Sequence, residues 1–343
     1  MRFSNRLVIL ATVALLLLWH GDSRAQSVLT FQGSGATFPY PLYQRWFIEF
    51  NKLNPQIRVN YSPEGSGQGI NAFLDHMVDV GMSDAPLTDG QIERVKRGVQ
   101  AVPMTAGNIV VTYNLPGSPP NLRLSREAVV AIFLRKATKW NDPVIQRQNR
   151  DVRLPEQPIT VVRRASGSGT TYAFTRHLSA ISKPWNDGPG FGKTVVWPTG
   201  TIGARGNQGV TALVETTPGA VGYVEYGFAR GAGLPMARLE NKRGRYIAPT
   251  EKSGQEALLG VTLPPEMNLW LPDPDREEAY PIVAYSWWFC YKEYKDPDKA
   301  EALRELIKYG LTEGQNFAPE LGYLPLPEKL AKKILSVSLK HIR

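Results

Sequence analysis

Cysteine is almost absent from this sequence. Cys290 is the only cysteine among 343 residues, so no disulfide can form within the chain and packing alone must hold the fold. It lies in the apolar run Ile282–Tyr291, where we interpret it as a small buried side chain. No cysteine lies near Ala25, so a lipid-anchored N-terminus is not indicated.

Histidine is scarce as well, and no metal-binding pattern is present. The chain has four histidines, no H-E-x-x-H motif and no cluster of cysteine and histidine. These absences disfavour metal-dependent hydrolases, and we expect neither a metal nor another cofactor.

Long apolar runs are limited to one, close to the N-terminus. Leu7–Trp19 is nearly all apolar but shorter than the roughly 20 residues that a membrane span needs. Arg2 and Arg6 precede it, and Ser23-Arg24-Ala25 follows with the small residues typical of a cleavage site. We therefore predict a cleaved signal peptide over residues 1–25, a periplasmic mature protein and no membrane anchor.

Positive charge is in excess but is not concentrated. Lysine and arginine number 40 against 31 acidic residues, giving a net charge of +9, and loss of residues 1–25 would leave +7. No long run of basic residues occurs, and export argues against a nucleic-acid partner. The excess therefore indicates either an anionic ligand or a solvated basic surface.

Short apolar runs alternate with helical patterns along the rest of the chain. Predicted strands are Val28–Gln32, Ile57–Tyr61, Val78–Met82, Ile109–Tyr113, Ile159–Arg163, Ala220–Val224 and Ile282–Tyr291. Predicted helices are Pro41–Lys52, Gly69–His76, Thr88–Arg97, Ser125–Leu134, Thr170–Ala180, Gln208–Thr216, Pro297–Tyr309 and Pro327–Leu335. This alternation predicts an α/β protein with mostly parallel sheets, and the length favours two lobes.

Three Gly-Ser-Gly turns each follow a predicted strand and precede a predicted helix. They are Gly33-Ser34-Gly35, Gly65-Ser66-Gly67 and Gly167-Ser168-Gly169. Such turns lie at the carboxyl ends of strands, where α/β sheets bind ligands. Free N–H groups and the partial positive charge of a helix start favour an anion there. A single turn of this kind is usually only a helix cap, but three of them, with Arg163-Arg164 beside the last, indicate an anion site.

A carboxylate accompanies these donors. Asp84 lies in Ser83-Asp84-Ala85-Pro86, directly after a predicted strand. It could cap the next helix, although Thr88 and Gln91 form a capping box there. Alternatively, because an ionised carboxylate only accepts hydrogen bonds, it would favour an oxyanion that still carries a proton, as phosphate does near neutral pH and sulfate does not.

Several motifs together resemble one known family. The chain is similar, in order from about Gly33 to Leu326, to the phosphate-binding protein of the bacterial phosphate ABC importer (the PstS family). The similar segments are Gly33–Pro39, Gly65–Gly67, Val78–Leu87, Lys139–Pro143, Val161–Thr171, Pro218–Tyr226 and Tyr280–Ile282. The resemblance implies a two-lobed periplasmic-binding-protein fold (type II), with a mostly parallel sheet flanked by helices in each lobe and two hinge strands. It implies a first lobe of residues 26–106 and 284–343 and a second of residues 107–283.

The resemblance also implies a site, a ligand and a partner. A monomer would bind inorganic phosphate between the lobes and deliver it to an inner-membrane ABC permease. Asp84 would accept the ligand's proton, and Arg164 would supply the charged clamp. The implied phosphate-binding residues are Thr37, Phe38, Ser66, Asp84, Arg164, Ser168, Gly169 and Thr170.

One position departs from the family pattern. The family often carries an aspartate two residues after the clamp arginine, where this chain has Ser166. Without that carboxylate Arg164 is less neutralised, unless Glu64 or another acid replaces it. We therefore predict phosphate binding that is more sensitive to salt than in the aspartate form.

Three other functions stay open from the sequence. Gly81-Met82-Ser83-Asp84-Ala85 comes close to the G-x-S-x-G elbow of a serine hydrolase but ends in alanine. The same fold could bind sulfate, arsenate, a phosphonate or an organic phosphate. A surface adhesin or scavenger could also reuse it.

Overall fold

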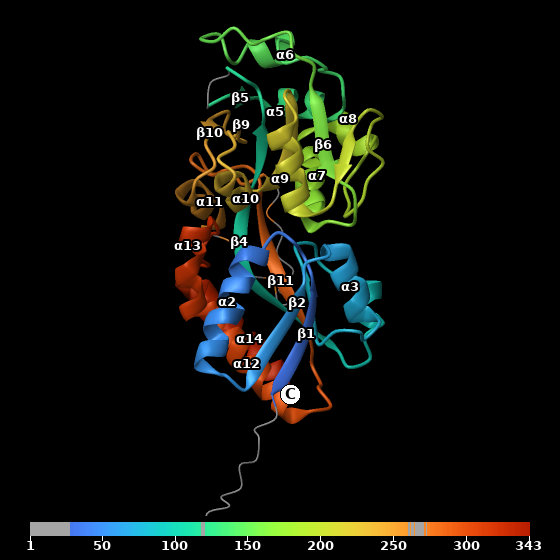
Figure 1. Cartoon of the computed structure of the whole chain (residues 1–343), viewed down its shortest axis with the longest axis vertical. Coiled ribbons are helices and arrows are strands. Elements are labelled where there is room, and N and C mark those ends of the chain that lie inside the picture. The colour runs from blue at the N-terminus through green and yellow to red at the C-terminus, as the bar shows by residue number, and fades with distance from the viewer. Residues whose placement is uncertain (1–27, 118–120, 260, 262–263, 265–270, 272) are drawn as a thin grey trace, which may run out of the picture.

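One continuous sheet runs through both lobes of the molecule. The computed structural model describes residues 28–117, 121–259, 261, 264, 271 and 273–343. The eight strands follow the order β2-β1-β3-β11-β4-β8-β6-β7. Figure 1 shows the two lobes stacked along the long axis, with β4 and β11 running between them. The expected two-lobed α/β fold is therefore confirmed.

The first lobe is built on three parallel strands. They are β1 (Leu29–Gly35), β2 (Ile57–Ser62) and β3 (Val80–Ser83), and β1 pairs in parallel with both neighbours. Helix α3 (Ser66–Leu74) lies on one side of the strands in Figure 1, and α2 (Tyr40–Leu53), α12 (Pro297–Leu311) and α14 (Glu328–Ser338) lie on the other. The chain leaves each strand into a helix that returns across the sheet, as the turn spacing predicts.

The second lobe repeats this arrangement. Strands β6 (Thr160–Arg164) and β8 (Ala220–Glu225) pair in parallel, and β7 (Ile202–Ala204) extends the edge beside β6. The main helices are α7 (Gly169–Ile181) and α9 (Gly206–Thr216). A small sheet of β10 (Tyr246–Ile247), β9 (Arg238–Glu240) and β5 (Arg123–Leu124) completes the lobe.

Two antiparallel strands join the lobes. Strand β4 (Val99–Tyr113) pairs with β11 (Val283–Tyr291) up to Asn108, and with β8 from Ile109 onward. The two hinge strands that the family resemblance implies are therefore present. The predicted lobe boundaries fall inside β4 and at the start of β11, and they stay a prediction. The predicted signal peptide lies outside the described residues.

Most predicted elements agree with the structure, and the differences have local reasons. Strand β4 begins at Val99, well before the predicted start at Ile109. The prediction missed the first half of the strand because it contains Pro103 and Gly107, residue types that usually interrupt a strand pattern. Helix α4 (Asp89–Glu93) ends four residues before the predicted Arg97. Several short elements were not predicted, namely α6 (Pro143–Gln146), α8 (Lys183–Asp187), α10 (Tyr226–Gly231), α11 (Glu251–Leu258), α13 (Ala318–Leu321) and strands β5, β7, β9 and β10. Helix α5 (Arg126–Phe133) agrees with its prediction.

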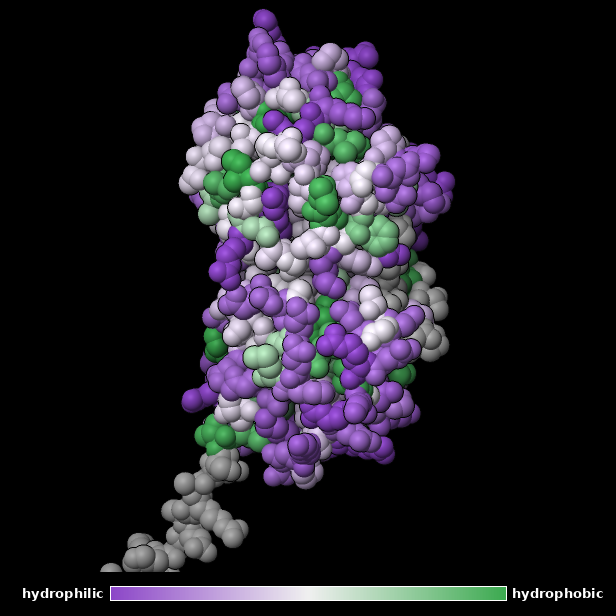
Figure 2. Space-filling model, turned by 90° about the vertical axis from the view of Figure 1, so that its right-hand side faces the viewer, coloured by the Kyte–Doolittle hydropathy of each residue, from purple (hydrophilic) through white to green (hydrophobic). Residues whose placement is uncertain are grey.

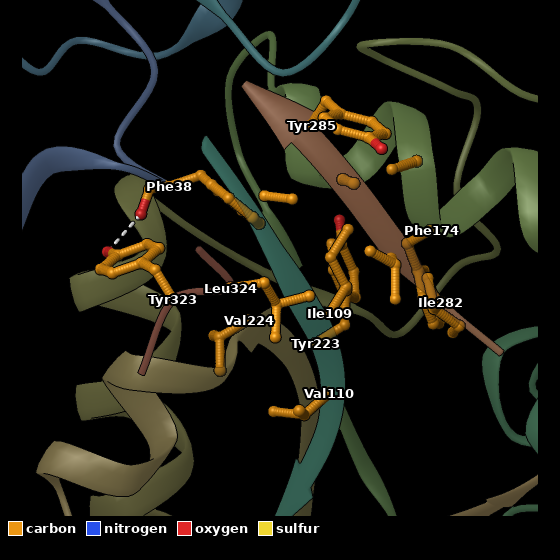
Figure 3. Packing of buried hydrophobic residues seen from close by; sticks show 14 of the residues in the cluster. Phe38, Ile109, Val110, Phe174, Tyr223, Val224, Ile282, Tyr285, Tyr323 and Leu324 are labelled. Atoms are coloured by element: carbon orange, nitrogen blue, oxygen red, sulfur yellow. Dashed lines mark hydrogen bonds between the residues drawn. The ribbon is translucent and has the colours of Figure 1, made fainter. Parts of the chain in front are cut away.

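The core continues without a break through the hinge. Figure 3 shows Phe38 and Tyr323 packed beside Ile109 and Val224, with Tyr223 and Phe174 further along the same cluster. Cys290 is fully buried, as predicted. On the face in Figure 2, hydrophobic residues form small separated groups within a mostly hydrophilic surface. Within the described ranges, no helix has both the length and the apolar character to cross a membrane.

Candidate functional site

The three Gly-Ser-Gly turns come together where the lobes meet. Within the first lobe, the Gly65 N–H donates to the Gly35 carbonyl at 2.7 Å. Between the lobes, the Gly67 N–H donates to the Gly167 carbonyl at 3.1 Å. This close approach depends on glycine, since a Cβ on Gly67 would lie 3.1 Å from the Gly167 Cα. The starts of α3 and α7 therefore point their free N–H groups toward one region.

Asp84 is buried in that region with one oxygen unsatisfied. It is 2% exposed and follows β3, while Thr88 and Gln91 form the capping box of α4, so Asp84 is not the cap of that helix. The Ser66 hydroxyl donates to Oδ2 at 3.4 Å, and Oδ1 has no partner among the described residues. Burial raises the Asp84 pKa to about 7, although Ser286, Arg164 and Ser66 each lower it.

Arg164 is the buried cation beside it. It ends β6 and is 3% exposed, and its backbone N–H donates to the Tyr223 hydroxyl at 3.3 Å. Nε and Nη2 have no partner within the described part of the chain. Burial lowers the Arg164 pKa, while Tyr223 and Asp84 raise it. Burying charged donors away from water without a hydrogen-bond partner costs several kcal/mol, and an anionic ligand would offset this cost.

The Ser168-Gly169-Thr170 segment forms the start of α7. The Ser168 hydroxyl is the helix cap and accepts from the Thr171 N–H at 3.1 Å. A Cβ added to Gly169 would lie 2.5 Å from Asp84 Cβ and 2.6 Å from Ser66 Oγ, so this helix start packs directly against the other lobe. The segment therefore brings free backbone N–H groups close to Asp84.

Thr37 and Phe38 approach from the start of α2. Both are buried. The Thr37 hydroxyl accepts hydrogen bonds from the backbone N–H and Nδ2 of Asn207, at 3.1 and 3.0 Å. The Phe38 carbonyl accepts from the Tyr323 hydroxyl at 2.7 Å, the dashed line in Figure 3. Both residues are thus held by segments far away in sequence.

Sequence reasoning missed the residues that support these groups. Asn207, Tyr223, Ser286 and Tyr323 contact the predicted site residues but belong to no Gly-Ser-Gly turn. Asn207 had a usable signal, because Arg205-Gly206-Asn207 leads from β7 into the first turn of α9 and carries a glycine, as the other three turns do. The other three depend on strand pairing and on the C-terminal segment, which no local pattern reveals.

Glu64 does not replace the aspartate that position 166 lacks. Its carboxylate pairs with Arg205 of the other lobe at 2.8 Å, in an exposed ion pair. Ser166 is near the arginine, since a Cβ on Gly65 would lie 3.5 Å from Arg164 Nη2 and 3.8 Å from Ser166 Oγ. Tyr223 and Asp84 are the groups that raise the Arg164 pKa, and Glu64 is not among them.

The serine-hydrolase alternative finds no support in the hydrogen bonds of Ser83. The Ser83 hydroxyl donates to the Ala85 carbonyl at 2.6 Å and accepts from the Ala85 N–H at 3.0 Å, so it stabilises its own turn. His76 contacts Arg97, and His177 is buried in α7, where burial lowers its pKa to about 4. Among the described residues, no histidine hydrogen-bonds to Ser83.

Comparison with known proteins gives consistent matches over most of the chain. The model of the PBP superfamily domain matches residues 21–313. The phosphate-binding protein PstS of Methanocaldococcus jannaschii is 37% identical, over 91% of this chain and 86% of the relative. That of Pasteurella multocida is 35% identical, over 93% of each.

Solved structures show the same fold. A high-affinity periplasmic phosphate-binding protein (PfluDING) bound with phosphate superposes with a TM-score of 0.73 at 20% identity, covering 90% of this chain and 93% of that chain. A putative phosphate ABC transporter substrate-binding protein from Clostridium perfringens with bound phosphate gives 0.65 at 16% identity, covering 87% and 100%.

Proposed function

This chain belongs to the PstS phosphate-binding proteins of the PBP superfamily, and we propose that it binds inorganic phosphate between its lobes and delivers it to an inner-membrane ABC permease. The observation that carries the proposal is that three buried atoms where the lobes meet, Asp84 Oδ1 and Arg164 Nε and Nη2, have no hydrogen-bond partner among the described residues. One anion carrying one proton satisfies all three, because it accepts from the guanidinium and donates to the carboxylate.

The predicted residues divide the work of binding in this proposal. Arg164 supplies the charge, and the helix starts supply N–H donors that need no reorganisation. Thr37 and Ser66 add hydroxyls, and Asp84 accepts the ligand's proton. The backbone donors come from Phe38, Ser168, Gly169 and Thr170.

Asp84 provides the discrimination against sulfate. Facing a fully ionised anion, its carboxylate meets a second lone pair and a repulsive charge. It could avoid this by taking up a proton itself, since its pKa lies at about 7 when only protein groups surround it. Sulfate would therefore bind more weakly than phosphate above neutral pH, and the difference would shrink as the pH falls.

The affinity is limited by desolvation and lobe closure. About ten charge-assisted hydrogen bonds of ~1.5–3 kcal/mol each would exceed any known affinity if they simply added. Stripping the anion of water and closing the lobes oppose them. We expect a micromolar to submicromolar Kd, roughly −8 to −10 kcal/mol.

The location and organisation follow from the same proposal. Residues 1–25 are removed as a signal peptide, and the mature protein works in the periplasm as a monomer without a membrane anchor. Residues 26–106 with 284–343 and residues 107–283 are the two lobes that close on the ligand. The protein is a binder and not an enzyme, which its transport-protein relatives support.

Isothermal titration of residues 26–343, freed of bound anion, tests the proposal. Phosphate should bind one to one, and sulfate should give no heat at about pH 8.5, where Asp84 with its pKa of about 7 is ionised. Binding of both would refute the selectivity assigned to Asp84, and binding of neither would refute the proposed function. Sustained release from a chromogenic phosphate ester would contradict a pure binding role.

A further inference from the structure

Asn207 lies fully buried between the lobes and bonds to both sides of the candidate site. Its backbone N–H and Nδ2 donate to Thr37 Oγ1, at 3.1 and 3.0 Å. Nδ2 also donates to Thr170 Oγ1 at 3.3 Å. One amide at the start of α9 thus contacts a hydroxyl from the first lobe and a hydroxyl from the second.

The orientation of this amide is fixed by a fourth hydrogen bond. The backbone N–H of Glu225 donates to Asn207 Oδ1 at 3.0 Å. A backbone N–H can only donate, so the oxygen of the amide must face Glu225. Both hydrogens of Nδ2 therefore face the two threonines, and flipping the amide would place Nδ2 against the Glu225 N–H, two donors without an acceptor.

Each threonine hydroxyl has a single hydrogen, and Asn207 determines where it goes. An oxygen that accepts from Asn207 must direct its own hydrogen elsewhere. Neither Thr37 nor Thr170 donates its hydroxyl hydrogen to an acceptor in the described part of the protein. We propose that Asn207 is a positioning residue, which makes both hydroxyls donors toward the phosphate.

This role, which rests on the proposed function, affects selectivity as well as affinity. With both hydroxyls donating, Asp84 is the acceptor for a ligand proton, so the site fits an anion that carries one proton. Hydroxyls turned the other way would offer two more acceptors, and the site would then favour a more protonated anion. Asn207 therefore helps set the ligand's protonation state without touching the ligand.

The substitution Asn207→Asp replaces the Nδ2 donor by an oxygen that accepts, and it keeps the oxygen that accepts from the Glu225 N–H. Its second oxygen would accept from Thr37 and Thr170, so their hydroxyls would stop donating to phosphate. We expect phosphate binding to weaken at least tenfold at about pH 8 and to recover partly toward about pH 5, as the new carboxyl gains a proton and can donate. Titration calorimetry at several pH values measures this.

A double-mutant cycle separates the effect of turning the threonine hydroxyls from the effect of the added negative charge. In the Thr37→Val, Thr170→Val background there is no hydroxyl to reorient, so Asn207→Asp should weaken phosphate binding less than about threefold. An equal loss in both backgrounds would mean that only charge or structure is affected, and would overturn the inference. Failure of the parent protein to bind phosphate would instead overturn the proposed function.

Asn149 provides the matched control. It is a buried asparagine of the same lobe, whose Nδ2 donates to Arg123 and Ile145 carbonyls and whose Oδ1 accepts from Arg123 N–H. It follows α6, at the end of the lobe far from the site in Figure 1. Asn149→Asp should leave phosphate binding within about twofold, and a loss equal to that of Asn207→Asp would contradict a specific role.

A neutron structure of the phosphate complex tests the inference even if Asn207→Asp does not fold. Deuterium on Thr37 Oγ1 and Thr170 Oγ1 should point to the anion, with both Nδ2 deuterons on the threonines. Deuterium pointing from either hydroxyl to Asn207 would refute it.

Discussion

At the scale of the residue, Arg164 is the group whose loss should cost the most binding. Its guanidinium is buried, and Nε and Nη2 have no partner in the part of the chain that the structure describes, so both can donate to an anion. In Arg164→Met a bound phosphate would become a buried anion without a counter-charge. We expect a loss of about 3–5 kcal/mol, or roughly 150- to 5,000-fold in Kd, by titration calorimetry.

The neighbouring arginine is the control for this prediction. Arg163 Nε donates to Thr201 Oγ1 at 3.3 Å, and its Nη1 donates to the Arg164 carbonyl at 3.1 Å. Arg163→Met should change the Kd less than about fivefold. Similar losses for the two variants would show that general positive charge, and not Arg164, binds the ligand.

Ser166 allows a second prediction at this scale. Its hydroxyl and Arg164 Nη2 both lie within 4 Å of the place that a Cβ on Gly65 would take, and Glu64 is already paired with Arg205. In Ser166→Asp the new carboxylate should partly neutralise the arginine, so phosphate binding should weaken less between about 0.05 and about 0.5 M NaCl. Ser166→Asn, which adds the same bulk without charge, should keep the salt dependence of the parent. If the phosphate affinity of Ser166→Asp fell with salt as steeply as that of the parent, the missing carboxylate would not explain the salt dependence.

At the scale of the element, the end of β8 carries a buried carboxylate that should make stability depend on pH. Glu225 caps α10, its Oε2 accepts from the Gly227 N–H at 2.9 Å, and Oε1 has no partner among the described residues. Burial raises its pKa well above the ordinary value of 4.5. The folded protein therefore keeps a proton that the unfolded chain releases, and stability falls as the pH rises above about 4.5.

Glu225→Gln should remove this loss of folding stability at higher pH. The variant should match the parent near pH 4 and melt a few degrees higher near pH 8, measured by thermal unfolding without phosphate. Glu156, exposed and paired with Lys139, is the control, and Glu156→Gln should not become more stabilising with pH. A constant difference between Glu225→Gln and the parent at all pH values would show that Glu225 is already ionised in the fold.

The elements also show how far the sequence could predict this protein. Helices α2, α3, α7 and α12 and strands β1, β2, β6 and β8 were found from periodicity and turn residues, because those signals are local. The candidate site residues were predicted from their turns and from the family resemblance, and their binding of phosphate stays a prediction. The first half of β4 could not be predicted, because its strand conformation comes from pairing with β11, nearly 200 residues away. Asn207 shows the same limit, since its role depends on partners in both lobes.

At the scale of the whole molecule, the two hinge strands join the lobes whose facing helix starts form the candidate site. The continuous sheet passes between the lobes only through β4 and β11 among the described strands, so we expect lobe closure to bend the molecule at these two strands. Contacts across the cleft are short and polar, such as Gly67 with Gly167 and Asn207 with Thr37. Closure is therefore limited by how closely two helix starts can approach, and by what lies between them.

Gly169 should control that approach. A Cβ at this position would lie 2.5 Å from Asp84 Cβ and 2.8 Å from the Asp84 carbonyl carbon. The backbone fixes both atoms, so a change of side-chain rotamer cannot relieve the clash. Gly169→Ala should leave the open form unstrained and oppose closure, so phosphate binding should weaken by about 2–3 kcal/mol, or roughly 30- to 150-fold. Small-angle X-ray scattering should show that phosphate no longer reduces the radius of gyration.

The control for closure is a glycine in α9 of the same lobe. A Cβ on Gly209 would lie 3.6 Å from its nearest neighbour, Ala204 Cβ, which is ordinary contact. Gly209→Ala should keep binding and compaction, and should slightly raise the melting temperature because alanine favours a helix. Both variants should fold, so a Gly169→Ala protein that melts like the parent but stays extended with phosphate supports closure through this contact. If it instead compacts and binds like the parent, the lobes must close around the ligand without bringing the start of α7 against Asp84.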